Sequence, residues 1–379
     1  MKKLLFIAKS MDSGGTEVSL INLLKKIYKE YDITLALLKK EGVYLEDIPN
    51  NVKIIEIYDK NLKNLDRKFS IDKKSLINTL KLIVYKIIKK INTEFIYKWQ
   101  LGKVSELNDQ YDIAIDFHGY GYFGTAYINH KVKTKRKFMF VHDEKIDWIK
   151  KVKNELPKFD EILCVSNSCK KKLEKEYGYL IKEARVCRNI IDIEKIKKMS
   201  KEKATVKFES VTNLLTIGRL EYQKGYDILI EIAKKLKNNN VKFNWYIIGQ
   251  GSLEDEIKKS LITNDLKNEV ILLGMQKNPY PFIDMCDMYI QPSRHEGYGI
   301  AIAEARILNK PIIATKLECI EEQIIDNQNG LLCNLDSEEF YQKIQMIINN
   351  EKKKNDLIEN LKKQSNIDNN DFKNIIEEK

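Results

Sequence analysis

Short, continuous apolar runs limit the possible folds of this chain more than any other feature of its sequence. Runs of about four to seven mostly apolar residues alternate with longer stretches in which apolar residues recur at helical spacing. Strands without period-two alternation are typical of parallel sheets that are buried on both faces. The alternation occurs twice along the chain, so the sequence predicts an α/β protein with two doubly wound domains.

The predicted strands form one series in each half of the chain. In the first half they are Leu4–Ala8, Ile33–Leu38, Val52–Ile57, Ile113–Phe117, Phe138–His142, Ile162–Ser166 and Ala184–Ile190. In the second half they are Leu214–Gly218, Trp245–Gly249, Val270–Gly274, Met288–Gln291, Ile312–Thr315 and Gly330–Cys333. Predicted helices between them include Glu17–Tyr28, Tyr226–Leu236, Leu253–Ile262, Ala301–Leu308 and Phe340–Ile348.

A polar, lysine-rich stretch, Glu194–Glu209, separates the two series and is the predicted linker. We therefore expect a first domain over residues 1–195 and a second over residues 196–355. The polar tail, residues 356–379, is expected to cross back onto the first domain.

Composition excludes several classes of protein. The chain has 379 residues, of which 43% are hydrophobic, with 16 Gly and 6 Pro, so collagen-like and disordered architectures are excluded. No apolar run reaches the ~18–20 residues that span a bilayer, and the N-terminus does not read as a signal peptide. We expect a cytoplasmic protein. The six cysteines show no C-x-x-C spacing, which favours buried thiols in a reducing compartment over a zinc site.

The net charge of +11 is concentrated in one region. Between Lys60 and Lys103 the chain has 12 Lys or Arg against 3 Asp or Glu, which indicates an anionic partner. Within this region, Leu76–Ile91 has apolar residues at helical spacing among lysines. It is either a helix in an anionic membrane interface or a surface helix packed on its own domain. Nucleic acid is not expected, because no recognised binding module is present.

Glycines follow the first predicted strand. Gly14 and Gly15 lie between that strand and a helix, where a backbone can approach an anion closely. A tight turn with Thr16 as the helix N-cap explains the same residues equally well.

The second series begins in a similar way. Arg219 and Lys224 follow a strand at its carboxyl end, where open α/β sheets bind ligands, and Gly249 ends the next strand. A guanidinium and an ammonium together suit a diphosphate. The alternative is two solvated surface cations.

The segment 291–305 carries the strongest signal. Gly297 and Gly299 open a loop into a helix whose amides can face an anion, while Glu296 and Glu304 lie about two turns apart. Carboxylates accept hydrogen bonds from the vicinal hydroxyls of sugars and ribose. A pair of hydrolase carboxylates is a rival interpretation, but nothing in the sequence places the two groups ~5 Å apart.

Taken in order, these motifs resemble a known family. They are Gly14-Gly15-x-Glu17, Gly218-Arg219-Leu220 with Lys224-Gly225, Gly249-x-Gly251, and Glu296-Gly297-Tyr298-Gly299 with Glu304-Ala305. The chain resembles the retaining nucleotide-sugar glycosyltransferases of the "group 1" (family 4) class over most of its length. The resemblance implies the glycosyltransferase-B architecture, two Rossmann-like domains facing across a cleft. The first domain would bind the acceptor and the second the nucleotide-sugar.

The resemblance also implies roles for single residues. Arg219 and Lys224 would neutralise the departing nucleoside diphosphate without a metal or other cofactor. Glu296 would bind hydroxyls of the donor sugar, Glu304 would bind the ribose, and His118 would lie near the reacting sugar. The implied catalytic set is His118, Glu296, Arg219 and Lys224. The other implied donor-binding residues are Gly14, Gly15, Gly249, Gly297, Tyr298, Gly299, Ile300 and Glu304.

The implied activity is transfer of a hexose, with retention, from a nucleotide-sugar, with UDP-sugar the commonest donor of the class. We expect a cell-surface glycan or lipid-linked saccharide as acceptor, as in capsule or other polysaccharide biosynthesis at the inner face of the membrane. The alternative is a non-catalytic subunit that binds a glycan or a partner. His142 and His295 are weaker candidates that ordinary structural roles explain.

Two segments depart from the family pattern. Arg188–Asp192 lacks the usual hinge glycine, and Leu317–Glu322 lacks the usual glycine-rich turn near the donor diphosphate.

Overall fold

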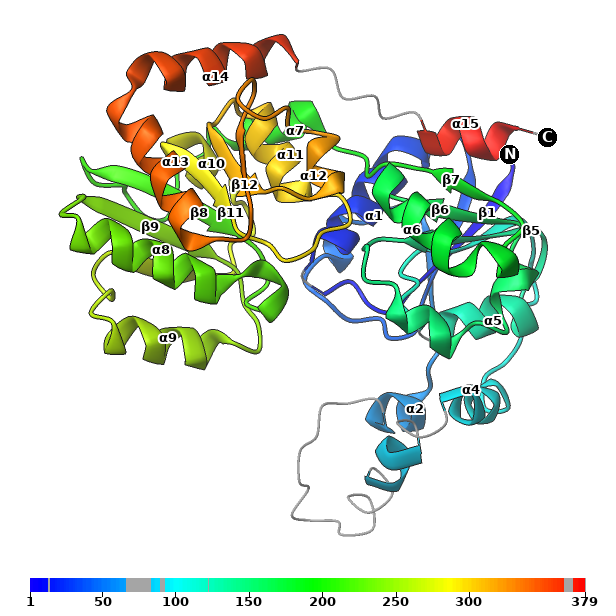
Figure 1. Ribbon diagram of the computed structural model, residues 1–379. Coiled ribbons are helices and arrows are strands. Elements are labelled where there is room, and N and C mark those ends of the chain that lie inside the picture. Colours follow the sequence, from blue (N-terminus) through cyan, green and yellow to red (C-terminus); the bar gives the residue numbers. More distant parts are fainter. Residues whose placement is uncertain (13, 66–82, 89–92, 122, 365–370, 379) are drawn as a thin grey trace. The chain divides into compact units, whose positions relative to one another are not determined.

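The computed structural model describes residues 1–12, 14–65, 83–88, 93–121, 123–364 and 371–378 (Figure 1). The chain forms two compact units. Unit 1 comprises Met1–Arg188 and Asn370–Lys379, and unit 2 comprises Asn189–Asn369. The predicted boundary at residue 195 falls inside helix α7 (Ile193–Met199), which packs against α10 and α11 of unit 2 and buries Ile196.

Unit 1 contains a seven-stranded parallel sheet with the order β3-β2-β1-β4-β5-β6-β7. Its strands are β1 (Lys3–Ala8), β2 (Asp32–Leu37), β3 (Lys53–Glu56), β4 (Gln110–Asp116), β5 (Lys133–Val141), β6 (Glu161–Cys164) and β7 (Ala184–Val186). β1 is buried from Leu4 to Ala8 and β6 along its whole length, as expected for strands that are covered on both faces.

Unit 2 contains a six-stranded parallel sheet with the order β10-β9-β8-β11-β12-β13. Its strands are β8 (Thr212–Ile217), β9 (Phe243–Ile248), β10 (Val270–Gly274), β11 (Met288–Gln291), β12 (Ile312–Thr315) and β13 (Leu331–Cys333). Each predicted strand has a counterpart, and the α/β class with two parallel sheets is confirmed.

Helices connect the strands of both sheets (Figure 1). In unit 1 they are α1 (Gly15–Ile27), α2 (Lys60–Leu65), α4 (Thr93–Leu101), α5 (Phe123–Lys131), α6 (Asn167–Tyr177) and the C-terminal α15 (Asp371–Glu377). In unit 2, after α7, they are α8 (Tyr226–Asn238), α9 (Glu254–Thr263), α10 (Tyr280–Met285), α11 (Ile300–Ile307), α12 (Glu318–Glu321), α13 (Ser337–Asn349) and α14 (Glu351–Lys363).

Some predicted element ends differ from the structure. Thr16 lies inside α1, and Gly14 is its N-cap without a side-chain hydrogen bond, so the N-cap interpretation of Thr16 is wrong. Strand β7 stops at Val186, opposite Cys164 at the end of its neighbour β6, and two residues later the Arg188 amide donates to the Asp371 carboxylate of α15. Most of the predicted helix Leu76–Ile91 lies outside the described residues, and its part at 83–88 is helical.

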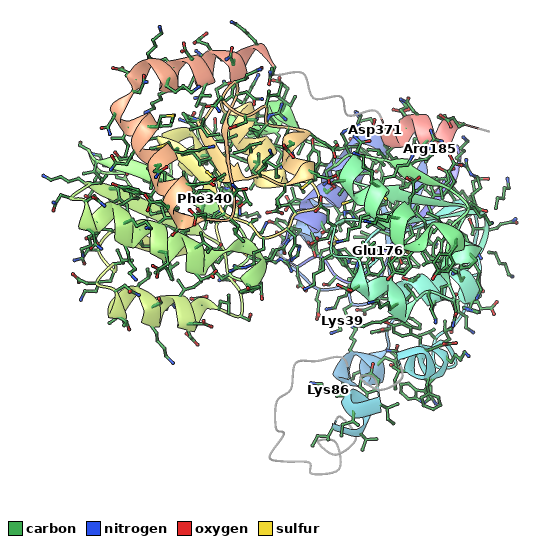
Figure 2. All side chains as sticks on the ribbon, in the orientation of Figure 1. Lys39, Lys86, Glu176, Arg185, Phe340 and Asp371 are labelled. Carbon is green, nitrogen blue, oxygen red and sulfur yellow. The ribbon has the colours of Figure 1, made fainter. Side chains whose placement is uncertain are left out.

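Only the last residues of the predicted tail return to unit 1. Leu357 and Leu361 of α14 are buried, so residue 356 lies within a helix of unit 2 rather than at the start of a free tail. The short helix α15 packs on unit 1, where the ring of Phe372 lies 5.9 Å from that of Phe6. Asp371, labelled in Figure 2, is the first residue of this helix, and Arg185, also labelled, pairs with Glu378 just after its end.

All six cysteines are buried free thiols. Among the described residues, no helix has the length and apolar character that crossing a membrane requires.

Candidate functional site

The strand order reverses at one point in each sheet. In unit 2, β8 lies beside β11, although β9 and β10 intervene in the sequence. In unit 1, β1 lies beside β4, although β2 and β3 intervene. Ligands of open α/β sheets bind outside the carboxyl ends of the strands at such points. The predicted residues Arg219, Lys224 and Glu296 follow β8 and β11, while His118 follows β4.

In unit 2 the structure brings Lys224 and Glu296 into direct contact. The Lys224 ammonium donates to Glu296 Oε1 at 2.6 Å, and the two side chains are only 16% and 8% exposed. An ion pair this buried is held by charge-assisted hydrogen bonding, and the loss of one partner leaves an uncompensated charge. Lys224 therefore is not a solvated surface cation.

A row of hydrogen bonds along β11 supports Glu296. The Ser293 hydroxyl donates to the same Glu296 oxygen at 2.7 Å. The Gln291 amide donates to Ser293 Oγ at 2.9 Å, and the Tyr289 hydroxyl donates to Gln291 Oε1 at 2.5 Å. Tyr289 and Gln291 leave β11 at alternate positions and so share one face, and Ser293 continues the row two residues beyond the strand. The row fixes the orientation of the carboxylate.

Arg219 lies in the same loop as Lys224 but is exposed. Its guanidinium donates to Gln223 Oε1 at 3.2 Å, and the Gln223 amide donates to the His295 carbonyl at 2.9 Å. Arg294, which precedes His295, makes two hydrogen bonds to the Asp227 carboxylate in the first turn of α8, at 2.8 and 2.6 Å. These contacts join the loop after β8 to the loop after β11.

Two glycines allow these loops to approach closely. A Cβ on Gly225 would lie 1.9 Å from the Pro292 carbonyl oxygen, and the residue has φ +69°. A Cβ on Gly249 would lie 1.9 Å from the Gly218 carbonyl oxygen, and its φ is +150°. Only glycine fits at either position without strain. Gly249 thus has a structural reason to be glycine, whatever it contacts.

Glu304 lies on α11 and is buried. The Tyr280 hydroxyl donates to Glu304 Oε1 at 3.1 Å. Burial raises the pKa of Glu304 to about 7, although the Tyr280 hydrogen bond opposes this. At neutral pH this carboxyl is therefore partly protonated, and it can both donate and accept hydrogen bonds.

The start of α11 is shaped by glycine. Gly299 caps the helix with φ +78°, and a Cβ there would lie 2.8 Å from the Ile320 side chain. Tyr298 is buried, and the Gln323 amide donates to its carbonyl. The Ile302 and Ala303 amides donate to the Gly299 carbonyl at 3.0 and 3.1 Å, while the amides of Ile300 and Ala301 precede the first bond of the helix. The glycine-poor segment Leu317–Glu322 forms the short helix α12 beside this point.

In unit 1, both ring nitrogens of His118 have a polar group nearby. The Lys9 amide donates to His118 Nδ1 at 2.7 Å, and His118 Nε2 lies 3.4 Å from Glu17 Oε1. Gly14 caps α1, and Gly15 is its first residue. The contact of Gly14 and Gly15 with a donor diphosphate stays a prediction.

Two further groups lie near His118. Burial raises the pKa of Asp116 to about 6, against the hydrogen bonds from the Thr125 hydroxyl and the Gly119 amide. Burial also lowers the pKa of His142 to about 4, so its ring is neutral at pH 7. Its Nε2 donates to the Phe117 carbonyl at 2.6 Å.

Sequence reasoning assigned no role to the groups that orient these residues. Tyr289, Gln291 and Ser293 were detectable from their period-two spacing before Glu296. The contacts of Glu17 and Tyr280 join segments far apart in the sequence, and no local signal reveals them. In the part of the chain that the structure describes, no group of three or more His, Cys, Asp or Glu side chains could hold a metal ion.

The sequence of unit 2 matches a known family. The family model described as "Glycosyl transferases group 1" matches residues 197–364. The match lies within unit 2 and covers most of it. Among curated relatives, an uncharacterised glycosyltransferase of Methanocaldococcus jannaschii is 35% identical over 149 residues, which are 38% of this chain and 41% of the relative.

A second relative has a described activity. It is the N-acetylgalactosamine-N,N'-diacetylbacillosaminyl-diphospho-undecaprenol 4-alpha-N-acetylgalactosaminyltransferase of Campylobacter jejuni. It is 27% identical over 183 residues, which are 48% of each chain. The matches to these two relatives and to a second glycosyltransferase of Methanocaldococcus jannaschii cover 41%, 48% and 42% of their lengths, so the chain spans less than half of each.

Solved structures match almost the whole chain. A TarM variant from S. aureus, in complex with fondaparinux, alpha-GlcNAc-glycerol and UDP, has a TM-score of 0.69 at 17% identity and covers 96% of both chains. Anabaena HepE in complex with UDP-glucose has the same TM-score and identity, covering 96% of this chain and 94% of its own. The predicted glycosyltransferase-B fold is confirmed.

Proposed function

We propose that this protein is a retaining, metal-independent glycosyltransferase that moves a hexose from a UDP-sugar to a cell-surface glycan or lipid-linked saccharide. The observation that carries the proposal is the buried Lys224–Glu296 pair at the point where the strand order of unit 2 reverses. The match of unit 2 to the group 1 family model supports it, as do the UDP and the UDP-glucose bound in the two similar solved structures.

The cations of unit 2 suit the leaving group. A nucleoside diphosphate gains negative charge as the glycosidic bond breaks, so a preorganised cation stabilises the transition state. Lys224 is held in place by Glu296, and Arg219 lies in the same loop. Both are assigned to the diphosphate, together with the amides at the start of α11. No side-chain nucleophile is assigned.

The two carboxyl groups suit hydroxyl groups. Lys224 and Ser293 both donate to Glu296 Oε1. The lone pairs of the other carboxylate oxygen, Oε2, are assigned to hydroxyls of the donor sugar. Glu304 is assigned to the ribose, since a carboxyl with a pKa of about 7 can exchange donor and acceptor roles with a diol. His118 in unit 1 is assigned to the reacting sugar.

Ligand binding tests the proposal directly. We expect UDP-sugars, but not GDP- or ADP-sugars, to raise the melting temperature of the protein. Binding at 100 times Kd stabilises the folded state by about 2.7 kcal/mol. The same sugar should then be transferred to a saccharide acceptor, with EDTA leaving the rate unchanged.

Arg219→Ala tests the assigned binding residue. Because Arg219 is exposed, its loss should reduce the rise in melting temperature caused by the UDP-sugar without lowering the stability of the free protein. A shift that requires manganese contradicts metal independence. A UDP-sugar that binds without hydrolysis or transfer identifies the chain as the non-catalytic subunit instead. No shift with any nucleotide-sugar overturns the proposal.

We propose in addition that the region Lys60–Lys103 contacts an anionic membrane surface, which would place the protein at the inner face of the cell membrane. Val84 and Ile87 are 50% and 52% exposed on the helical segment 83–88, and Phe95 is 55% exposed on α4. Tyr85 of the same segment is buried, and its hydroxyl accepts from the Gln100 amide of α4 at 3.2 Å. Lys86, labelled in Figure 2, adds positive charge there.

Vesicle binding tests this contact. The protein should cosediment with phosphatidylglycerol vesicles, and less so with neutral vesicles or in high salt. The double variant Val84→Asp and Ile87→Asp should lower binding about tenfold or more, because burying each side chain contributes ~1.5–3 kcal/mol. Tyr179→Asp, at a residue of unit 1 that is 81% exposed, is the matched control and should bind normally. Equal binding by both variants, or binding to RNA alone, contradicts the contact.

A further inference from the structure

Just beyond the ends of the neighbouring strands β1 and β4, the hydrogen-bond ladder of the unit 1 sheet is interrupted. The Phe117 amide donates to the Ile7 carbonyl at 3.0 Å, as in a parallel pair. The next bond of such a ladder would join the Lys9 amide to the Phe117 carbonyl. Here both groups bond to imidazole rings, since Lys9 N–H donates to His118 Nδ1 and the Phe117 carbonyl accepts from His142 Nε2.

This arrangement fixes the proton of His118. A backbone amide is only a donor, so His118 Nδ1 must accept and carries no hydrogen. The proton of the neutral ring therefore lies on Nε2. His118 in this state donates a hydrogen bond through Nε2 and offers no free lone pair to act as a base.

Glu17 faces that proton. Its Oε1 lies 3.4 Å from His118 Nε2, and the two side chains are 14% and 8% exposed. Its second oxygen lies against Gly14, where a Cβ would be 2.5 Å from Glu17 Oε2. Because Gly14 has no side chain, the Glu17 carboxylate can turn back from the first turn of α1 toward His118. The spacing Gly14-x-x-Glu17 thus has a physical reason apart from any phosphate.

We propose that Glu17 is a positioning residue for His118 in the transfer reaction, an inference that rests on the proposed function. Its carboxylate holds the imidazole with Nε2–H directed to the edge of the sheet where ligands bind. In the free protein the one N–H of the ring faces Glu17 at 3.4 Å. When the sugar binds, an oxygen of the sugar shares this hydrogen bond, with Glu17 as the second acceptor. Gly14 is required in this arrangement because it leaves room for the carboxylate.

Histidine NMR tests the pairing without substrate. The chain has four histidines, so ¹⁵N-labelled rings give few signals, and His118→Ala assigns the one of interest. We expect a slowly exchanging Nε2–H on His118 that is lost in Glu17→Ala and kept in Glu17→Gln, whose side-chain oxygen still accepts. Gly14→Ala should also lose it with little change in melting temperature, because the added Cβ displaces only the end of a flexible side chain.

Kinetics with the UDP-sugar that the wild type turns over test the role. Glu17→Ala should lower kcat about 10- to 100-fold with KM nearly unchanged, as expected when a reacting group is misplaced. Glu17→Gln should recover most of this loss, and the double variant Glu17→Ala and His118→Ala should be no slower than His118→Ala. Glu46→Gln, at an exposed glutamate of unit 1, is the matched control.

The outcomes separate the two proposals. If the wild type transfers sugar but Glu17→Ala is fully active, or if its effect adds to that of His118→Ala, the positioning role is wrong. An unchanged Nε2–H signal in Glu17→Ala overturns it as well. If the wild type transfers no sugar at all, the proposed function fails, and the positioning role in transfer fails with it.

Discussion

Replacing Lys224 by methionine should lower the rate of sugar transfer about 30- to 1000-fold, since one charge-assisted contact in a closed site contributes ~2–4 kcal/mol to catalysis. The same change should destabilise unit 2 by about 3 kcal/mol, because it leaves Glu296 as a buried carboxylate without its cation. Steady-state kinetics and urea unfolding measure the two effects.

A double-mutant cycle separates the ion pair from catalysis. Glu296→Gln removes the charge that Lys224 balances, so the double variant Lys224→Met and Glu296→Gln should recover part of the stability, with a coupling of ~0.5–3 kcal/mol. Its activity should stay low, because the diphosphate still lacks its cation. Lys234→Met, which removes a lysine of α8 that pairs with Glu231, is the matched control and should change neither quantity. Full activity in Lys224→Met would contradict the assignment.

The fold could be predicted well because its signal is local. Strands such as Met288–Gln291 and Val270–Gly274 have the predicted ends, since each is a continuous apolar run closed by glycine or polar residues. Strand β7 is shorter than its apolar run, because its neighbour β6 ends opposite Val186, and the Arg188 amide beyond it bonds to Asp371, which lies 183 residues away. Periodicity carries no information on such a contact.

The candidate site was predictable in its positions and not in its contacts. Motif spacing indicates Lys224 and Glu296, but a sequence does not show that they bond to each other at 2.6 Å. Spacing also leaves the environment of Glu304 unknown, because its raised pKa results from burial beside Tyr280 on another helix. Charge states at a site depend on the packing of distant segments.

Replacing Phe372 by alanine should destabilise unit 1 by ~3–5 kcal/mol, the usual cost of removing a buried aromatic side chain. Phe372 is 2% exposed, and its ring lies 5.9 Å from that of Phe6 and 6.4 Å from that of Phe140. Although α15 has only seven residues, it closes the core of a unit whose first segment ends at Arg188, 183 residues before Asp371. Urea unfolding followed by circular dichroism measures the change.

The neighbouring residue provides the control for this prediction. Lys373 is 41% exposed and pairs with Glu30 at 2.6 Å, so Lys373→Ala should cost at most ~1 kcal/mol, as exposed ion pairs contribute little. The expected losses of stability differ between these adjacent positions because buried apolar surface holds α15 on unit 1. The ion pairs of Glu377 with Lys2 and of Glu378 with Arg185 orient the helix. Equal losses in the two variants would mean that the charges, not the buried ring, hold the helix.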